Sequence, residues 1–196
     1  DMEKEDRNRI GVVYGVGIGG IKTFEEEVTY YGQHLGEEPK FNPFFIPKII
    51  ADIAAGHISI MYGLHGPNYA TTSACASSTN ALADAFNLIR LGKANVVVSG
   101  AEAAICGCGV GGFNAMHALS TRNDDPERAS RPFSKSRDGF VMGEGAGCLI
   151  LEELEHAKAR GAKIYAEMVG EGASADAHHI TASHPEGLGA KLVMQN

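Results

Sequence analysis

Cys75 is the residue of this sequence whose type and surroundings best suit covalent chemistry. It lies between a predicted strand and a predicted helix, in a run of small residues at 71–80 that reads Thr-Thr-Ser-Ala-Cys-Ala-Ser-Ser-Thr-Asn. Unpaired backbone N–H groups and the dipole at a helix N-terminus favour the thiolate, which is the nucleophilic form of cysteine. A free cysteine is also among the residue types most often buried as small hydrophobes, so the local sequence leaves both interpretations open.

A glycine pattern near the N-terminus suggests a second chemistry. Gly15, Gly17 and Gly20 follow a predicted strand with the spacing G-x-G-x-x-G. In dinucleotide-binding proteins this pattern cradles a pyrophosphate, and Glu37 or Glu38 would then bind the ribose. We reject that interpretation, because a lone glycine motif is weak and no second strand visibly ends at those glutamates. A tight strand-to-helix turn lining a pocket is the preferred interpretation.

Residue types that ligate metals occur in two places. Cys106 and Cys108 are separated by one residue and are isolated from other ligand types. A later polar stretch carries an aspartate and three histidines, Asp176, His178, His179 and His184. Their spacing matches no compact ligand pattern. We therefore interpret the cysteines as packing residues and the later stretch as a solvated loop, and we expect neither a metal nor a cofactor.

Residues 123–137 form a polar loop that holds the basic cluster of the sequence, Arg128, Arg131, Lys135 and Arg137. An ordinary solvated loop explains such a cluster. In an acidic protein the same cluster could dock an acidic partner, so both interpretations stay open.

Alternating strands and helices must position all of these residues. Apolar runs predict strands near 11–15, 69–74, 95–100, 147–152 and 164–169. Helical periodicity and end signals predict helices at 23–31, 48–62, 81–90, 114–121 and 152–160, with another starting at 187. This alternation indicates the α/β class.

Composition excludes several classes of protein. A chain of 196 residues suffices for one sizeable core, one domain and part of another. Its net charge of -7 argues against a nucleic-acid partner. No apolar run approaches the roughly 20 residues that span a bilayer, so no membrane segment is expected. The 4 cysteines form no dense disulfide framework, and no targeting peptide is visible. Cytoplasm is the expected localisation.

Several segments together resemble one family. They are Ala-Cys-Ala-Ser-Ser at 74–78, Gly-Val-Gly-Gly-Phe at 109–113, Ala-Leu-Ser-Thr-Arg-Asn at 118–123, Ser-Arg-Pro-Phe at 130–133 and Arg-Asp-Gly-Phe-Val-Met-Gly-Glu-Gly-Ala-Gly at 137–147. Segments 59–67 and 161–167 match in the same order. The sequence thus resembles the beta-ketoacyl-ACP synthases, the type II condensing enzymes of fatty acid synthesis, over essentially its whole length.

This resemblance implies a fold and an assembly. The family has a thiolase-like fold, in which two pseudo-equivalent halves build layers of helices and sheets (α/β/α), and it forms homodimers. Residues 1–160 would be part of the N-terminal half, which would be incomplete. Residues 161–196 would start the C-terminal half, most of which would be missing.

The resemblance also implies roles for single residues. Cys75 matches the nucleophile that takes an acyl chain from acyl carrier protein as a thioester, and its backbone N–H would be one oxyanion donor. Malonyl-carrier would then lose carbon dioxide, and its carbanion would attack that thioester. Ile18 matches a position that lines the acyl pocket, and Phe45 one that reaches the partner subunit's pocket. Phe113, in the second segment, is a further expected substrate-binding residue.

Some features of the family are not found in the sequence. Its two catalytic histidines, a lysine and a glycine-phenylalanine-glycine loop would all lie beyond Asn196, and the histidines at 178–184 do not match those motifs. We therefore expect a central fragment that cannot condense alone. His117 stands where related enzymes often carry a carrier-contacting arginine, so the sequence departs from the family at that contact. The alternative function is a non-catalytic scaffold fragment that dimerises or docks a carrier.

Overall fold

Strand β1 (Ile10–Val16) is buried along its whole length in the structure, a computed structural model that describes residues 2–196. Successive side chains of a strand point to opposite faces of its sheet. Accordingly, Val12, Tyr14 and Val16 belong to one hydrophobic cluster, and Val13 belongs to a second cluster. A strand of this composition therefore needs a covering layer on both of its faces.

The sheet has four strands in the order β2-β1-β3-β4. Strand β1 runs parallel to both of its neighbours, β2 (Asn68–Thr71) and β3 (Val96–Ala103). Strand β4 (Gly145–Glu152) lies beside β3. In this register the carboxyl ends of β1 and β2 lie side by side, because Gly15 pairs with Thr71.

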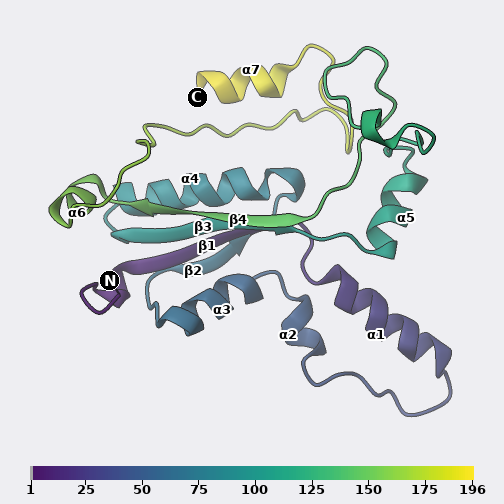
Figure 1. The fold of residues 1–196 in the computed structure, drawn as a ribbon, viewed down its shortest axis with the longest axis horizontal. Helices are drawn as coiled ribbons and strands as arrows, with labels where there is room; N and C mark the ends of the chain where they lie inside the picture. Colours follow the sequence, from purple (N-terminus) through teal and green to yellow (C-terminus); the bar gives the residue numbers. More distant parts are fainter. Residues whose placement is uncertain (1) are drawn as a thin grey trace. The chain divides into compact units, whose positions relative to one another are not determined.

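Helices cover the two faces of the sheet (Figure 1). Helix α3 (Ile53–Tyr62) packs on one face, where Ala55 joins the cluster of Val12 and Tyr14. Helix α4 (Ser77–Arg90) packs on the other face through Ala81 and Ala85, which are fully buried. The expected α/β class with helix, sheet and helix layers is therefore confirmed.

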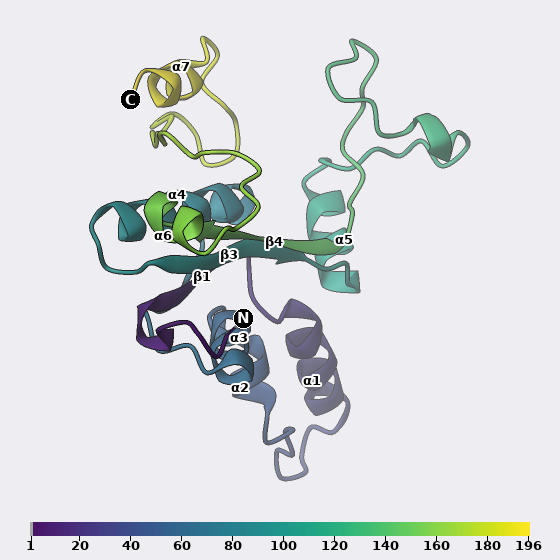
Figure 2. The same cartoon turned by 60° about the vertical axis from the view of Figure 1, so that its left-hand side comes forward.

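The described residues also form further helices and 3-10 turns. Helices α1 (Ile21–Gln33) and α2 (Phe45–Ile49) lie on the same side of the sheet as α3 (Figure 2). The others are η1 (Arg7–Arg9), η2 (Ala74–Ala76), α5 (Gly107–Ala115), η3 (Pro126–Arg128), α6 (Leu154–Ala159) and α7 (Leu188–Gln195).

Three predicted elements are wrong. Residues 164–169 form no strand, and Tyr165 and Val169 are 87% and 83% exposed. An apolar run becomes a strand only beside an edge that accepts its hydrogen bonds, and no described strand pairs with this one. The helix predicted at 114–121 lies earlier, as α5, and His117 after it has a positive φ of 54°. The single helix predicted at 48–62 is two helices, because Ile50 is extended.

The chain divides into two compact units, the second of which is Glu152–Asn196. The predicted division into thiolase-like halves at residues 160 and 161 stays a prediction.

Glu152 organises the start of the second unit. Its side chain is only 9% exposed, Oε1 accepts a hydrogen bond from Arg160 Nε at 2.7 Å, and His156 Nδ1 lies 2.6 Å from the same oxygen. The hydrogen bonds from Arg160 and, more weakly, the nearby His156 hold the pKa of Glu152 below its ordinary value of 4.5. The carboxylate is therefore stabilised in the folded state.

Replacing Glu152 with glutamine should lower the free energy of unfolding by about 1 kcal/mol at neutral pH, since Arg160 is partly solvated. Because the folded pKa is lowered, this stabilisation is complete above the unfolded pKa and is lost as the pH falls through the folded value. Urea unfolding should show a gap between wild type and variant that narrows below about pH 4.5. Glu155→Gln, which removes an exposed partner of Lys158, is the matched control and should change nothing measurable.

Candidate active site

Cys75 is exposed and lies in η2, the short 3-10 turn between the end of β2 and the start of α4. The expected strand, cysteine and helix order is therefore confirmed, and the interpretation of Cys75 as a buried packing residue is wrong for this structure. Its backbone enters a helix of 14 residues, whose N-terminal N–H groups favour a negative charge nearby.

The turn that carries Cys75 is strained. Ala74 has a φ of 50°, in the left-handed region that non-glycine residues adopt at a cost of about 1–2 kcal/mol. Such a conformation persists only where neighbouring groups hold it. Two side-chain hydrogen bonds flank the turn: Thr71 Oγ1 donates to Ser77 O at 2.8 Å, and Asn80 Nδ2 donates to Ser73 Oγ at 2.7 Å.

The glycine run that begins near the end of β1 packs against this turn. A Cβ atom on Gly15 would lie 2.6 Å from the backbone carbon and oxygen of Ser77, whereas one on Gly17 would lie 3.9 Å from Ala74 O. Gly15 is thus required because the cysteine turn and the start of α4 approach β1 closely. This close approach explains a glycine of the G-x-G-x-x-G pattern without a bound dinucleotide.

A tyrosine and an aspartate link α4 to β2 beside the turn. Tyr69 Oη donates to Asp84 Oδ2 at 3.3 Å. Burial, followed by the charge and hydrogen bond of Asp84, raises the pKa of Tyr69 to about 12. The phenol therefore stays protonated at physiological pH and keeps donating to the carboxylate.

Cys108 is the cysteine of α5 that also reaches solvent. Local desolvation, then the Glu25 carboxylate and Cys106, raise the pKa of its thiol. Because the thiolate is the reacting form, Cys108 is poorly suited to act as a nucleophile. Cys75 and Cys108 are therefore both exposed but are not equally suited to nucleophilic chemistry.

The three predicted substrate-binding residues lie on different elements. Ile18 follows β1 and is 66% exposed. Phe45, at the start of α2, stacks on Phe41 with ring centroids 5.2 Å apart. Phe113, on α5, meets Phe140 edge to face at 5.2 Å. The structure therefore does not bring the three together in one contact, and their roles stay predictions.

A shallow hollow of about 470 Å³ lies between α1 and the start of α5. Its lining is Lys22, Glu25, Glu26, Thr29, Tyr30, Gln33, Cys106 and Gly107. None of Cys75, Ile18, Phe45 and Phe113 belongs to that lining, so this hollow is not the expected acyl pocket.

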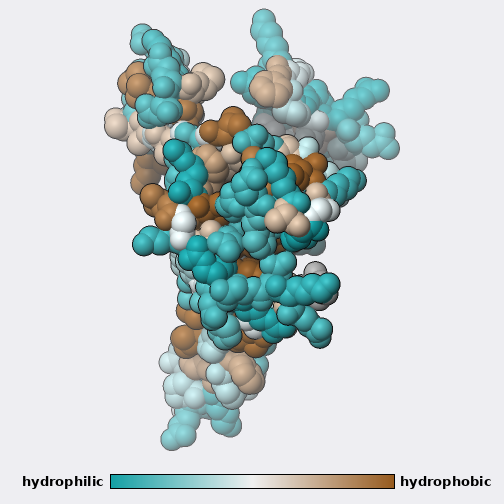
Figure 3. Space-filling view, turned by 90° about the vertical axis from the view of Figure 1, so that its left-hand side faces the viewer, coloured by the Kyte–Doolittle hydropathy of each residue, from teal (hydrophilic) through white to brown (hydrophobic). Residues whose placement is uncertain are grey.

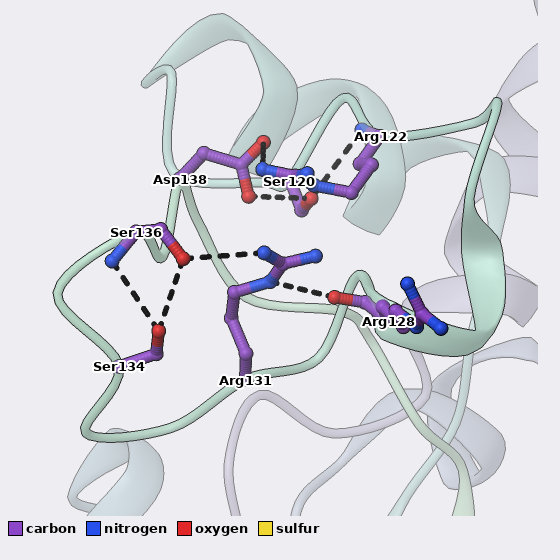
Figure 4. A network of polar contacts seen from close by, with 7 residues as sticks. All are labelled: Ser120, Arg122, Arg128, Arg131, Ser134, Ser136 and Asp138. Carbon is purple, nitrogen blue, oxygen red and sulfur yellow. Dashed lines mark hydrogen bonds and ion pairs between the residues drawn. The ribbon is translucent and has the colours of Figure 1, made fainter.

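The basic loop is tied together by its own arginines (Figure 4). Arg131 Nε donates to Arg128 O at 2.6 Å, and its Nη1 donates to Ser136 Oγ at 3.2 Å. Asp138 accepts from Ser120 Oγ at 2.9 Å and lies 3.9 Å from Arg122 Nη2. Arg137 Nη1 likewise donates to Ser134 O at 2.8 Å. The charges of Arg131 and Arg137 therefore shape the loop itself, which weakens the interpretation of the whole cluster as a docking surface.

Two of the residues whose types can bind metals make structural hydrogen bonds instead. Cys106 Sγ accepts a hydrogen bond from Gly109 N–H at 3.4 Å and caps α5. Asp176 Oδ1 accepts from Gly189 N–H at 3.1 Å, in the first turn of α7. Within residues 2–196, no three His, Cys, Asp or Glu side chains gather in a way that suits a metal ion.

The sequence model of a protein family, described as "Beta-ketoacyl synthase, N-terminal domain", matches residues 1–157. The chain belongs to the beta-ketoacyl synthase family. Curated relatives include 3-oxoacyl-[acyl-carrier-protein] synthase 2 from Staphylococcus aureus, which is 50% identical over 197 residues, or 100% of this chain and 48% of that protein. The Vibrio cholerae serotype O1 protein of the same name is 48% identical, over 100% of this chain and 47% of its own length.

Solved structures confirm the thiolase-like fold expected of the family. A beta-ketoacyl synthase from Burkholderia phymatum STM815 is 35% identical with a TM-score of 0.83, over 95% of this chain and 46% of its own. The ketosynthase complex AntDE:AntF, described as a type II PKS acyl-carrier protein with its ketosynthase bound to the hexaketide, is 33% identical with a TM-score of 0.92. That match covers 98% of this chain and 49% of the other.

The chain therefore spans about half the length of the curated relatives it matches. In the part of the chain that the structure describes, no helix combines the length and apolar character required to cross a bilayer.

The residues around the cysteine that sequence reasoning missed are Thr71, Ser73, Ser77 and Asn80. Short polar residues beside a helix start were the available signal, because they commonly bond to nearby backbone groups.

Proposed function

We propose that this chain supplies the nucleophile of a condensing enzyme of fatty acid synthesis. The Cys75 thiolate attacks the carbonyl carbon of an acyl thioester on acyl carrier protein and expels the carrier thiolate. Malonyl-carrier loses carbon dioxide, and the resulting carbanion attacks the Cys75 thioester. The new carbon–carbon bond lengthens the chain by two carbons and releases the Cys75 thiolate.

The observation that carries this proposal is the placement of Cys75. It is solvent-exposed, in a strained turn at the start of α4, within a chain of the beta-ketoacyl synthase family. Strain of this kind gathers at functional sites, where neighbouring contacts hold the reacting group in one orientation. The Cys75 backbone N–H is our proposed donor to the oxyanion that forms on the acyl carbonyl.

We propose an acyl carrier protein as the partner and a homodimer as the assembly. The AntDE:AntF complex supports the first, because there a carrier protein is bound to a ketosynthase. Exposed apolar side chains on α3 and β4 support the second, namely Ile60, Met61, Leu149 and Ile150. Brown apolar patches also interrupt the teal surface in Figure 3. Large exposed apolar groups of this kind mark interaction surfaces.

Ile18, Phe45 and Phe113 are our proposed contacts to the acyl chain. Each has an apolar side chain that is at least partly accessible. The expected cytoplasmic localisation likewise stays a prediction.

Mass spectrometry of the protein at its full natural length tests the proposed function. Incubation with acyl-carrier should add one acyl group, and peptide analysis should place it on Cys75. No adduct, or an adduct that survives Cys75→Ala, would contradict the proposal.

The second candidate is a scaffold that dimerises or docks a carrier without chemistry. The exposed apolar residues of α3 and β4 favour it, because they need no catalytic cysteine. The same incubation separates the two: carrier binding with no acyl adduct on Cys75 supports the scaffold.

A further inference from the structure

Ser77 is a polar residue that is almost completely buried, with 3% exposure, at the first position of α4. Its Oγ donates to Ala74 O at 2.7 Å and lies 3.4 Å from Val16 O. The same Oγ accepts a hydrogen bond from Ser73 N–H at 2.9 Å. One hydroxyl group therefore contacts the backbone on both sides of the Ser73–Ala74 peptide and the end of β1.

These contacts enclose the strained residue of the turn. Ala74 has the left-handed φ of 50°, and its carbonyl accepts from both the Oγ–H and the backbone N–H of Ser77. Ser77 is itself fixed from the other side, because Thr71 Oγ1 donates to its carbonyl at 2.8 Å. The conformation of Ala74 thus depends on a hydroxyl group anchored to the ends of both β1 and β2.

Cys75 directly follows Ala74 and lies two residues before Ser77. Its sulfur projects from a backbone whose direction is set by the dihedral angles of Ala74 before it. An alanine in the left-handed region returns to ordinary angles when its support is lost, and the next side chain then changes direction. The hydrogen bonds of the Ser77 hydroxyl join Ser73 and Ala74 of the turn and Val16 at the end of β1, so the hydroxyl acts mainly on the turn.

We propose that Ser77 is a positioning residue for Cys75: its buried hydroxyl holds Ala74 in the left-handed conformation and so directs the Cys75 sulfur towards the incoming acyl thioester. This inference depends on the proposed role of Cys75 as the nucleophile. Ser77 itself contacts no reacting atom in this scheme.

The experiment measures the alkylation rate of Cys75 by iodoacetamide, followed by peptide mass spectrometry, in the protein at its full natural length. The exposed Cys108 is the internal reference within the same sample. Ser77→Ala should slow Cys75 about 2- to 10-fold, the range for one net hydrogen bond, and leave Cys108 unchanged. Ser77→Thr keeps the hydroxyl and should restore the rate to within about twofold of wild type. Thermal unfolding of each variant controls for loss of the fold.

A double variant tests the route through Ala74. Glycine adopts a positive φ without support, so position 74 should no longer need the Ser77 hydroxyl once it is glycine. Adding Ser77→Ala to the Ala74→Gly variant should therefore slow Cys75 alkylation less than adding Ser77→Ala to wild type does. An unchanged Cys75 rate in Ser77→Ala overturns the proposal. Equal losses in the two backgrounds also overturn it, because Ser77 would then act by another route.

Acyl loading from the carrier, measured on the same variants, separates this inference from the proposed function. Normal loading with no dependence on Ser77 overturns the positioning role alone. No loading of Cys75 in the wild type, with alkylation that still depends on Ser77, overturns the nucleophile role alone.

Discussion

Cys75→Ala should abolish acyl loading and lower the condensation rate by at least about 1000-fold, because removing a covalent nucleophile commonly costs more than that. No neighbouring side chain replaces the thiolate, since the adjacent residues of the turn are alanines. The assay incubates the protein at its full natural length with purified acyl-carrier and malonyl-carrier. Mass spectrometry then measures how fast the condensation product forms.

Cys108→Ala is the matched control for this variant. Both cysteines are exposed, but desolvation and Glu25 raise the pKa of Cys108, whereas Cys75 lies at the start of a long helix. Loading and condensation should therefore be unchanged in Cys108→Ala. Loss of loading in this control, with loading retained in Cys75→Ala, would assign the nucleophile to Cys108 and refute our assignment.

The sequence predicts the central elements well because their periodicity is set by burial. In β1 the run Ile-Gly-Val-Val-Tyr-Gly-Val is buried on both faces, so an almost continuous apolar pattern is diagnostic. In α4 the spacing of Ala81, Ala85 and Leu88 marks the face that packs on the sheet. Local composition and tertiary packing agree at these positions.

The wrong elements are those in which local pattern and tertiary context disagree. Residues 164–169 are apolar enough for a strand, but a strand also needs a partner edge, which local sequence does not encode. Helix α5 contains four glycines, at 107, 109, 111 and 112, which lower helix propensity and conceal the helix from pattern analysis.

The active-site turn is only partly predictable for the same reason. The position of Cys75 at a helix start follows from short-range sequence. The support of its backbone does not, because the contacts join residues far apart, such as Val16 and Ser77. A buried serine hydroxyl in this role cannot be distinguished in sequence from an ordinary helix-start serine.

Gly15→Ala should disrupt the same turn from the side of the sheet. The added Cβ would lie 2.6 Å from Ser77 C and O and 2.7 Å from Ser78 N, which are backbone atoms that no rotamer change can move. Strand β1 cannot retreat, because it pairs with β2 and β3 on its two sides. Helix α4 must therefore shift away from the sheet, against the contacts of Ala81 and Ala85.

We expect this variant to lose at least about 3 kcal/mol in the free energy of unfolding, the upper end for overpacking, since the clash is with backbone. Urea unfolding measures the loss, and iodoacetamide alkylation should show altered Cys75 reactivity in the remaining folded protein. Gly17→Ala is the matched control: its Cβ would meet only Ala74 O, at 3.9 Å, so stability should change by less than about 0.5 kcal/mol. Equal losses of unfolding free energy in the two variants would contradict this account. They would show that stability depends on the flexibility of the glycine run and not on the close approach of the cysteine turn to Gly15.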